Sequence, residues 1–120
     1  MLASAAAHYV GVGRTQALAD FTARKAPFSD RDLYVICVDR QRVFAANGRF
    51  PALVGVSADV LKDEHLLPLG DAMWTAVAKT PRAVIRYGGM NPVSRRSEMK
   101  RTFLHRLSED VCGVGVYDPR

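Results

Sequence analysis

The stretch LYVICVD, at Leu33–Asp39, is the strongest indicator of the fold in this sequence. It is a continuous apolar run rich in β-branched and aromatic residues, and its length suits a strand better than a helix. The lack of alternation predicts a strand covered on both faces. After a polar connection, residues 43–46 return as a partner strand that ends at Asn47 and Gly48, which is typical of a hairpin.

Three further strand-like runs lie towards the C-terminal end, at residues 83–88, 99–107 and 111–117. A polar loop that contains Arg95 and Arg96 separates the first two, and we expect both arginines to lie in solvent. A tight turn separates the second run from the third. Together with the central hairpin, these runs predict a five-stranded antiparallel sheet.

Helices are expected on either side of the central hairpin. Residues 2–25 are rich in alanine and free of proline, which predicts a long N-terminal helix. Gly11 and Gly13 weaken its middle by about 1 kcal/mol each relative to alanine and should kink or fray it there. Asp71 is suited to cap a short helix over residues 73–79. Helices packed on an antiparallel sheet make an α+β fold.

The totals predict one soluble domain. A chain of 120 residues, 48% apolar and 24% charged, can bury one core. The helix would occupy residues 1–25. The sheet and the ligand pocket would be formed by residues 28–117. No run approaches the length of about 20 apolar residues needed to cross a bilayer. The first residues also lack the basic start of a signal peptide, so we expect membrane attachment only through segments outside this sequence.

Cys37 and Cys112 both lie in apolar strand-like runs, where a small buried thiol is a common filler. We therefore expect two free thiols in the core. A disulfide is the alternative, since it requires only that the two strands be neighbours with Cα atoms within about 7 Å. No cluster of His and Cys has the spacing of metal ligands, so neither a metal site nor a cofactor is expected.

The net charge of +5 is concentrated in one stretch. Residues 81–106 hold seven basic side chains and one acidic side chain, Glu98, whereas the rest of the chain holds ten basic and eleven acidic. Such a stretch can attract small anions, acidic lipids or phosphate backbones. Nucleic acid is not expected as a partner, because only Tyr87 and Phe103 are available there as stacking platforms.

Six short motifs are spread along the chain in an informative order. They are FSDRDLYVICVD at residues 28–39, PALVG at 51–55, KD at 62–63, YGGMNP at 87–92, KRTFL at 100–104 and GVGVY at 113–117. Their types and order resemble single Cache domains, whose corresponding motifs read F-x-D-x-D-L-Y-V-F-V-x-D, P-x-L-V-G, K-D, Y-x-W-P-N-P, K-x-x-Y-V and G-x-G-I-Y. The resemblance extends from about Gly13 to Tyr117.

The resemblance implies a PAS-like fold, in which a five-stranded antiparallel sheet carries a long N-terminal helix and short helices. It also implies a periplasmic or other extracytoplasmic sensor of a bacterial signalling system, such as chemotaxis, that binds small molecules, often short organic acids. The sequence departs from the family at Gly89, where a tryptophan is usual, and in the longer segment after Lys62. The ligand's identity is therefore not carried over.

The expected ligand contacts come from the faces of two strands. On a strand, alternate residues share a face, so Lys100 and Thr102 project together, and Tyr87 lies on the preceding strand. A lysine among hydroxyl groups offers the donors that a carboxylate requires. We expect a small organic anion to bind Tyr87, Lys100 and Thr102, with Tyr34 and Trp74 as walls and Arg86 as an alternative cation.

These residues also have structural interpretations. Lys100 and Arg86 could be solvated charges on the sheet, and Tyr34 and Trp74 could be core residues. Gly113 and Gly115 share one face of the last strand, where they leave room for a ligand or for a closely packed helix, and we favour packing.

An enzyme is not expected, because the sequence has no Gly-rich phosphate loop, nucleophile elbow or paired carboxylates. The alternative to a sensor is a ligand-free interaction module that forms a homodimer through the helix at residues 2–25.

Overall fold

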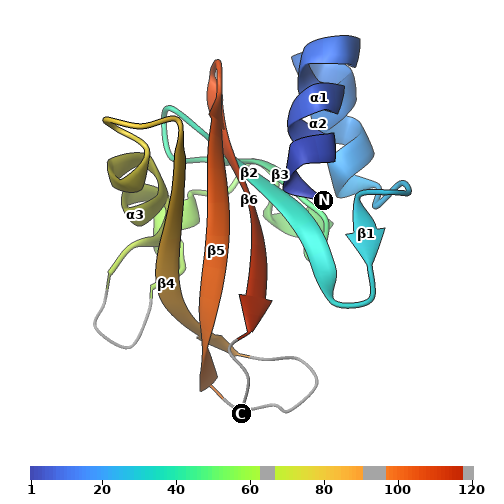
Figure 1. The fold of residues 1–120 in the computed structure, drawn as a ribbon. Helices are drawn as coiled ribbons and strands as arrows, with labels where there is room; N and C mark the ends of the chain where they lie inside the picture. Colours follow the sequence, from blue (N-terminus) through green and yellow to red (C-terminus); the bar gives the residue numbers. More distant parts are fainter. Residues whose placement is uncertain (63–66, 91–96, 118–120) are drawn as a thin grey trace.

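An antiparallel β-sheet forms the centre of the protein in the computed structural model, which describes residues 1–62, 67–90 and 97–117 (Figure 1). Its strands are β1 (Ser29–Asp30), β2 (Leu33–Asp39), β3 (Phe44–Asn47), β4 (Arg82–Met90), β5 (Ser97–Leu107) and β6 (Asp110–Tyr117). Their order is β1-β2-β6-β5-β4, with β3 paired to β2 as well. The five predicted strands and the α+β class are confirmed, and the two-residue β1 makes a sixth strand within the described residues.

The N-terminal region forms two helices instead of the single helix predicted for residues 2–25. They are α1 (Leu2–Val12) and α2 (Arg14–Thr22), which lie side by side (Figure 1). The chain breaks at Gly13, whose φ of 89° is readily adopted only by glycine. No helix within the described ranges is long and apolar enough to cross a membrane.

The short helix α3 (Leu69–Ala76) follows two single 3-10 turns, Pro51–Leu53 and Ala58–Val60. It begins two residues before the predicted cap, and the side chain of Asp71 makes no capping hydrogen bond. Instead, the backbone N–H of Asp71 donates to Oδ1 of Asp59 at 2.9 Å. Capping by Asp71 was therefore a wrong prediction, because a carboxylate from the preceding 3-10 turn fills that role.

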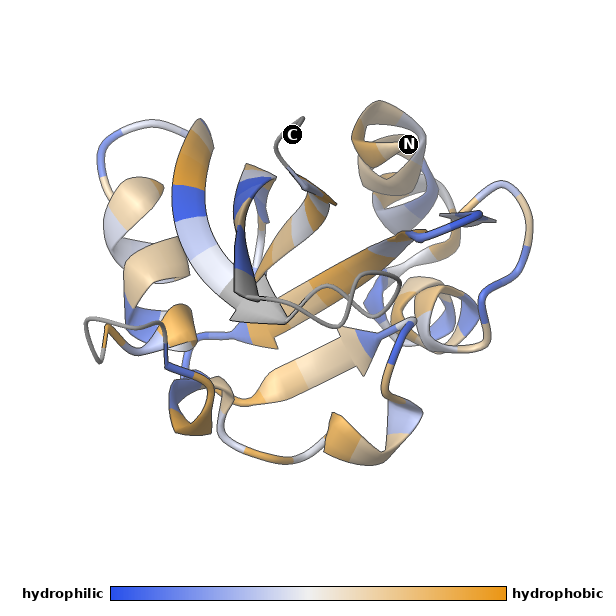
Figure 2. Cartoon of the chain, turned by 90° about the horizontal axis from the view of Figure 1, so that it is seen from below, coloured by the Kyte–Doolittle hydropathy of each residue, from blue (hydrophilic) through white to orange (hydrophobic). Residues whose placement is uncertain are grey.

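Side-chain alternation along β2 and β6 divides the core into two clusters. Val35 and Cys37 of β2, with Val114 of β6, face α1 and α2. Val38 and Val111 belong to the second cluster, on the side of α3. Seen from below, the two helical groups lie at opposite ends of the curved sheet (Figure 2). The unbroken apolar run of β2 thus arises because the strand is covered on both faces, as predicted.

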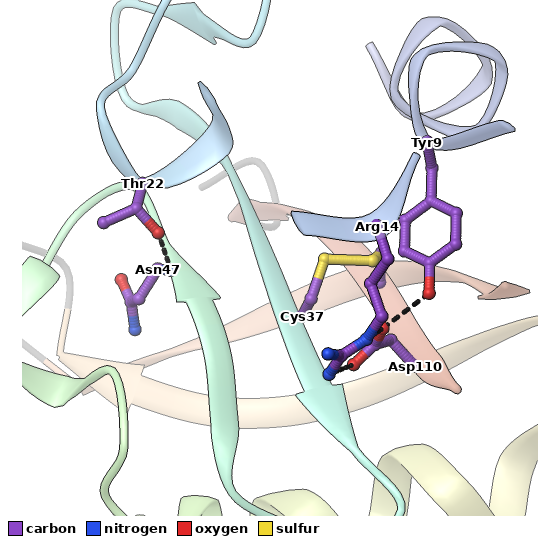
Figure 3. The surroundings of a disulfide bond; sticks show 7 residues. Tyr9, Arg14, Thr22, Cys37, Asn47 and Asp110 are labelled. Carbon is purple, nitrogen blue, oxygen red and sulfur yellow. Dashed lines mark hydrogen bonds and ion pairs between the residues drawn. A yellow bond between two sulfur atoms is a disulfide. The ribbon is translucent and has the colours of Figure 1, made fainter. Parts of the chain in front are cut away.

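Cys37 and Cys112 form a disulfide that joins β2 to β6, so the prediction of two free thiols is wrong (Figure 3). The two cysteines are directly paired in the sheet, with Cα atoms 4.0 Å apart, and both side chains are fully buried. The bond closes a sequence separation of 75 residues. It became possible because the first long strand lies beside the last one, which is a non-local pairing.

A buried carboxylate ties both N-terminal helices to the turn between β5 and β6. Asp110 is fully buried and accepts hydrogen bonds from Tyr9 Oη at 2.6 Å and from Arg14 Nε and Nη2 at 2.7 and 3.0 Å (Figure 3). Burial, followed by the bond to Asp110, raises the pKa of the Tyr9 phenol, which therefore stays a donor. The two-pronged arginine contact is the stronger type of ion pair.

A second carboxylate, Asp20 of α2, joins the two helices to each other. It contacts His8 of α1 at 2.7 Å, Gln16 at 2.8 Å and Lys25 at 3.1 Å. These contacts, the one from His8 most of all, lower the pKa of Asp20 from 3.8 to about 2. The ionised form therefore stabilises the fold above the unfolded pKa, and this contribution is lost as the pH falls through about 2.

Reduction of the disulfide is expected to lower the free energy of unfolding by about 2–4 kcal/mol, because the long loop closed by Cys37 and Cys112 is then free in the unfolded chain. Urea denaturation with and without a reducing agent measures this difference. The double variant Cys37→Ala/Cys112→Ala serves as the control and should not respond to the reductant. A wild-type midpoint that is the same in both conditions would contradict the assignment.

Candidate ligand-binding site

A cavity of about 940 Å³ lies between one face of the sheet and the segment that joins β3 to α3. The sheet supplies its floor from β2, β4, β5 and β6, and the 3-10 turn before Leu61 supplies its other wall. The residues around it are Arg24, Arg31, Asp32, Tyr34, Ile36, Phe44, Asn47, Arg49, Phe50, Val60, Leu61, Lys62, Leu69, Tyr87, Gly88, Lys100, Thr102 and Tyr117.

Four of the six predicted contacts line this cavity, because the strand register brings them to one face. Tyr87 is paired with Lys100, which is paired in turn with Tyr117 on β6. Thr102 lies two residues further along the same face of β5, and Tyr34 approaches from β2. The expectation that alternate residues of β4 and β5 share a face is therefore confirmed by the register.

The other two predicted contacts lie elsewhere. Trp74 donates its Nε1–H to the carbonyl of Asp39 at 2.6 Å, and the guanidinium of Arg40 lies 5.1 Å from its ring centre. Arg86 is exposed and is paired with Arg101, so it belongs to the opposite face of β4. Neither residue is among those that line the cavity. Arg95 and Arg96, expected in solvent, lie outside the described residues.

The ammonium group of Lys100 is held between two aromatic rings at the cavity. Its Nζ donates to Tyr34 Oη at 3.2 Å and lies 4.7 Å from the ring centre of Tyr34 and 5.0 Å from that of Tyr117. Burial lowers the pKa of Lys100, while the charges of Tyr117 and Asp32 act in the opposite direction. Rings stabilise a nearby cation, but no carboxylate in the part of the chain that the structure describes forms a salt bridge with it.

Gly115 makes room for the Lys100 side chain. A Cβ at position 115 would collide with Lys100 Cε and lie 2.8 Å from its Cδ. At Gly113 an added Cβ would lie 3.0 Å from Thr102 Cγ2, so the threonine methyl packs there. Both glycines therefore serve packing, as favoured from the sequence, but the elements packed against them are side chains of β5 instead of a helix.

Asn47 is a cavity residue that the sequence analysis interpreted only as the end of a hairpin strand. Its Oδ1 accepts the backbone N–H groups of Arg49 at 3.1 Å and Phe50 at 2.8 Å. These two donors fix the orientation of the amide and leave its Nδ2 for the cavity side. The backbone N–H of Asn47 also donates to Thr22 Oγ1 at 3.2 Å, which connects the site to the end of α2 (Figure 3).

The cavity is strongly basic. Besides Lys100, the described part of its lining includes four exposed basic residues and one acidic residue, Asp32. These four cations come from outside residues 81–106, where the sequence concentrates its excess charge. Sequence reasoning missed them because they lie in separate turns that only the fold brings together. They are Arg24, Arg31, Arg49 and Lys62.

Three solved structures share the fold of this chain. No family model and no curated protein matches the sequence. The first structure is a methyl-accepting chemotaxis protein from Vibrio parahaemolyticus RIMD 2210633, at TM-score 0.78 and 18% identity, which covers 97% of this chain and 82% of that one. The second is a Cache chemosensory domain studied for carboxylic acid recognition, with TM-score 0.74 and 17% identity, and the match covers 98% of this chain and 84% of that one. The third is a periplasmic sensor domain of a chemotaxis protein, with TM-score 0.72 and 19% identity, and the match covers 95% of this chain and 83% of that one.

This chain has the Cache fold. At 17–19% identity the arrangement of the elements is shared while most side chains differ, so the site must be judged on its own residues. Within the described residues, no group of three or more His, Cys, Asp or Glu side chains could hold a metal ion.

In this Cache fold, Tyr87 fastens the outer wall of the cavity to the sheet. Its ring is buried, and its Oη lies 2.7 Å from the carbonyl oxygens of both Leu61 and Leu67. A hydroxyl has one hydrogen to donate. The carbonyl of Leu61 also accepts the N–H of Leu69 at 2.9 Å. Tyr87 therefore positions the wall, whether or not it touches a ligand.

The variant Tyr87→Phe is expected to lose about 1 kcal/mol of unfolding free energy, because the hydrogen bond from the sheet to the outer wall is removed. Urea denaturation measures the loss. A urea midpoint equal to that of the wild type would show that the phenol does not hold the wall.

Proposed function

We propose that this chain is the sensor domain of a bacterial signalling protein and binds a small organic anion, such as a short carboxylate, in the cavity beside Lys100. The observation that carries the proposal is the half-buried ammonium group of Lys100, which faces the cavity and forms no salt bridge with a carboxylate of the described residues. A ligand carboxylate would supply the missing counter-charge.

The surrounding donors suit a carboxylate in number and type. Nζ of Lys100, Nδ2 of Asn47 and the hydroxyl of Thr102 border the same cavity, in which apolar side chains such as Ile36 and Phe44 exclude water. A few convergent donors in an otherwise apolar pocket are typical of small-molecule sites. Charge-assisted hydrogen bonds of this kind are also stronger than neutral ones. A ligand-free dimerisation module would gain nothing from such a cavity.

Two further observations support a sensor outside the cytoplasm. The three similar structures are sensor domains of chemotaxis proteins or a chemotaxis receptor, one of them studied for carboxylic acid recognition. The buried disulfide between Cys37 and Cys112 is the type of bond that persists in the periplasm and other oxidising compartments.

The variant Lys100→Met is expected to bind short monocarboxylates roughly 10 to 100 times more weakly, which corresponds to the loss of a charge-assisted contact. Its melting temperature without ligand should be unchanged or higher, because a half-buried charge has been replaced by an apolar chain. Titration calorimetry with a panel from acetate to hexanoate provides the affinities.

Two companion variants sharpen this test. Arg101→Gln removes a charge from the opposite face of β5 and should leave the affinity unchanged. Gly115→Ala should weaken binding as Lys100→Met does, since the added methyl displaces the lysine. If no carboxylate raises the melting temperature at millimolar concentration, or if Lys100→Met binds as tightly as the wild type, the proposal fails.

The affinity is also expected to depend on pH in one direction. A carboxylate is fully ionised near neutrality, so affinity should stay constant there and fall as the pH rises through the lowered pKa of Lys100. Below that pKa the ammonium is charged, and above it the counter-charge is gone. Calorimetry over a pH series measures the fall. An affinity that stays constant up to 10.5, the ordinary pKa of lysine, would contradict a role for Lys100.

A further inference from the structure

The cations of the cavity lie at two levels. Lys100 is half-buried between two aromatic rings, whereas Arg24, Arg31, Arg49 and Lys62 are exposed. Within the described lining, a carboxylate bound to Lys100 would leave four basic side chains at the outer level, of which Arg31 also contacts Asp30, and one acidic residue, Asp32. These described residues therefore carry more positive charge than a ligand with one anionic group would balance.

Two of the outer arginines occupy an unfavourable backbone conformation. Arg24 has a φ of 59° and Arg31 a φ of 57°, in the left-handed region that glycine adopts without strain. Among the described residues, both side chains make exposed contacts, Arg24 Nε to Ser29 Oγ at 3.0 Å and Arg31 Nε to Asp30 at 3.4 Å. Local strain of this kind is often tolerated where a side chain has a functional role.

The space between the two levels is apolar and large. The side chains of Ile36, Phe44, Val60, Leu61 and Leu69 line it. The cavity volume of about 940 Å³ is at the upper end of the range for pockets that hold drug-sized ligands. A two- or three-carbon acid would fill only a small part of it. A longer carbon chain would cover this apolar surface.

We propose that the ligand carries two anionic groups joined by an apolar chain, with one group at Lys100 and the other at Arg24, Arg31 and Arg49. This inference rests on the proposed function and specifies the class of ligand, an α,ω-dicarboxylate or a molecule of equivalent charge and length. The inner contact provides binding of any carboxylate, and the outer arginines select for the second charge.

Matched pairs of acids test the ligand class. Butanoate with succinate, hexanoate with adipate, and octanoate with suberate have equal chain lengths and differ by one carboxylate. For at least one pair, the diacid is expected to bind the purified protein 10 times more tightly or better by calorimetry. The monomethyl ester of adipate should behave like hexanoate. Monoacids that bind as well as every diacid would overturn this inference alone, whereas no binding in the series would also overturn the proposed function.

Glycine variants at positions of positive φ separate the loss of a side chain that binds the ligand from the relief of backbone strain. Arg31→Gly should retain or raise the melting temperature, because strain is relieved, and should lower diacid affinity several-fold while leaving monoacid affinity unchanged. Ser108→Gly is the matched control: Ser108 has a φ of 53° in the turn between β5 and β6, away from the cavity. Its diacid affinity should equal that of the wild type.

Because the outer arginines could substitute for one another, the double variant Arg31→Gly/Arg49→Gln completes the test. It is expected to bind the preferred diacid no more tightly than the matched monoacid. A double variant that keeps the full preference for the diacid would show that the outer cations do not contact the ligand.

Discussion

The antiparallel pairing of β2 with β6 brings the first long strand beside the last, and both halves of the molecule are built on it. It places Cys37 opposite Cys112 and provides the surface on which α1 and α2 pack. On the reverse face it provides the floor of the cavity, and β5 and β4 extend the sheet from β6. Such a non-local contact requires closure of a long loop against chain entropy, and the disulfide reduces that entropic cost by restricting the unfolded chain.

Gly115 links the pairing of β2 with β6 to the cavity, because it has no side chain that would block Lys100. Tyr34 lies on β2 and Lys100 on β5, so β6 runs between them. Strands are spaced about 4.8 Å apart, so the two residues start about two strand spacings from each other. Lys100 meets Tyr34 only because its chain crosses the surface of β6 at a glycine, where any Cβ would collide with it. The position of the ammonium is therefore set by β6, which leaves space for the lysine chain at Gly115 and supplies the Tyr117 ring beside its Nζ.

The sequence predicted what depends on local pattern. Strand periodicity placed Lys100 and Thr102 on one face, and the register confirms this. Contacts between distant segments were not predictable. The pairing of Cys37 with Cys112 depends on strand order, and the outer arginines of the cavity come from three separate turns. Trp74 was placed by its residue type alone, which does not tell a cavity wall from the outer contact it makes with Asp39.

Stabilising and destabilising features are separated across the sheet. The disulfide and the Asp110 cluster both lie on the face towards α1 and α2. The features that oppose stability lie on the cavity side. They are the desolvated ammonium of Lys100 and the strained backbone of the outer arginines Arg24 and Arg31. Unfavourable groups persist only when the surrounding structure over-determines them. Because residues alternate between faces along each strand, a single strand pairing serves both: its helix face fixes the backbone, and its cavity face helps to hold the desolvated ammonium of Lys100.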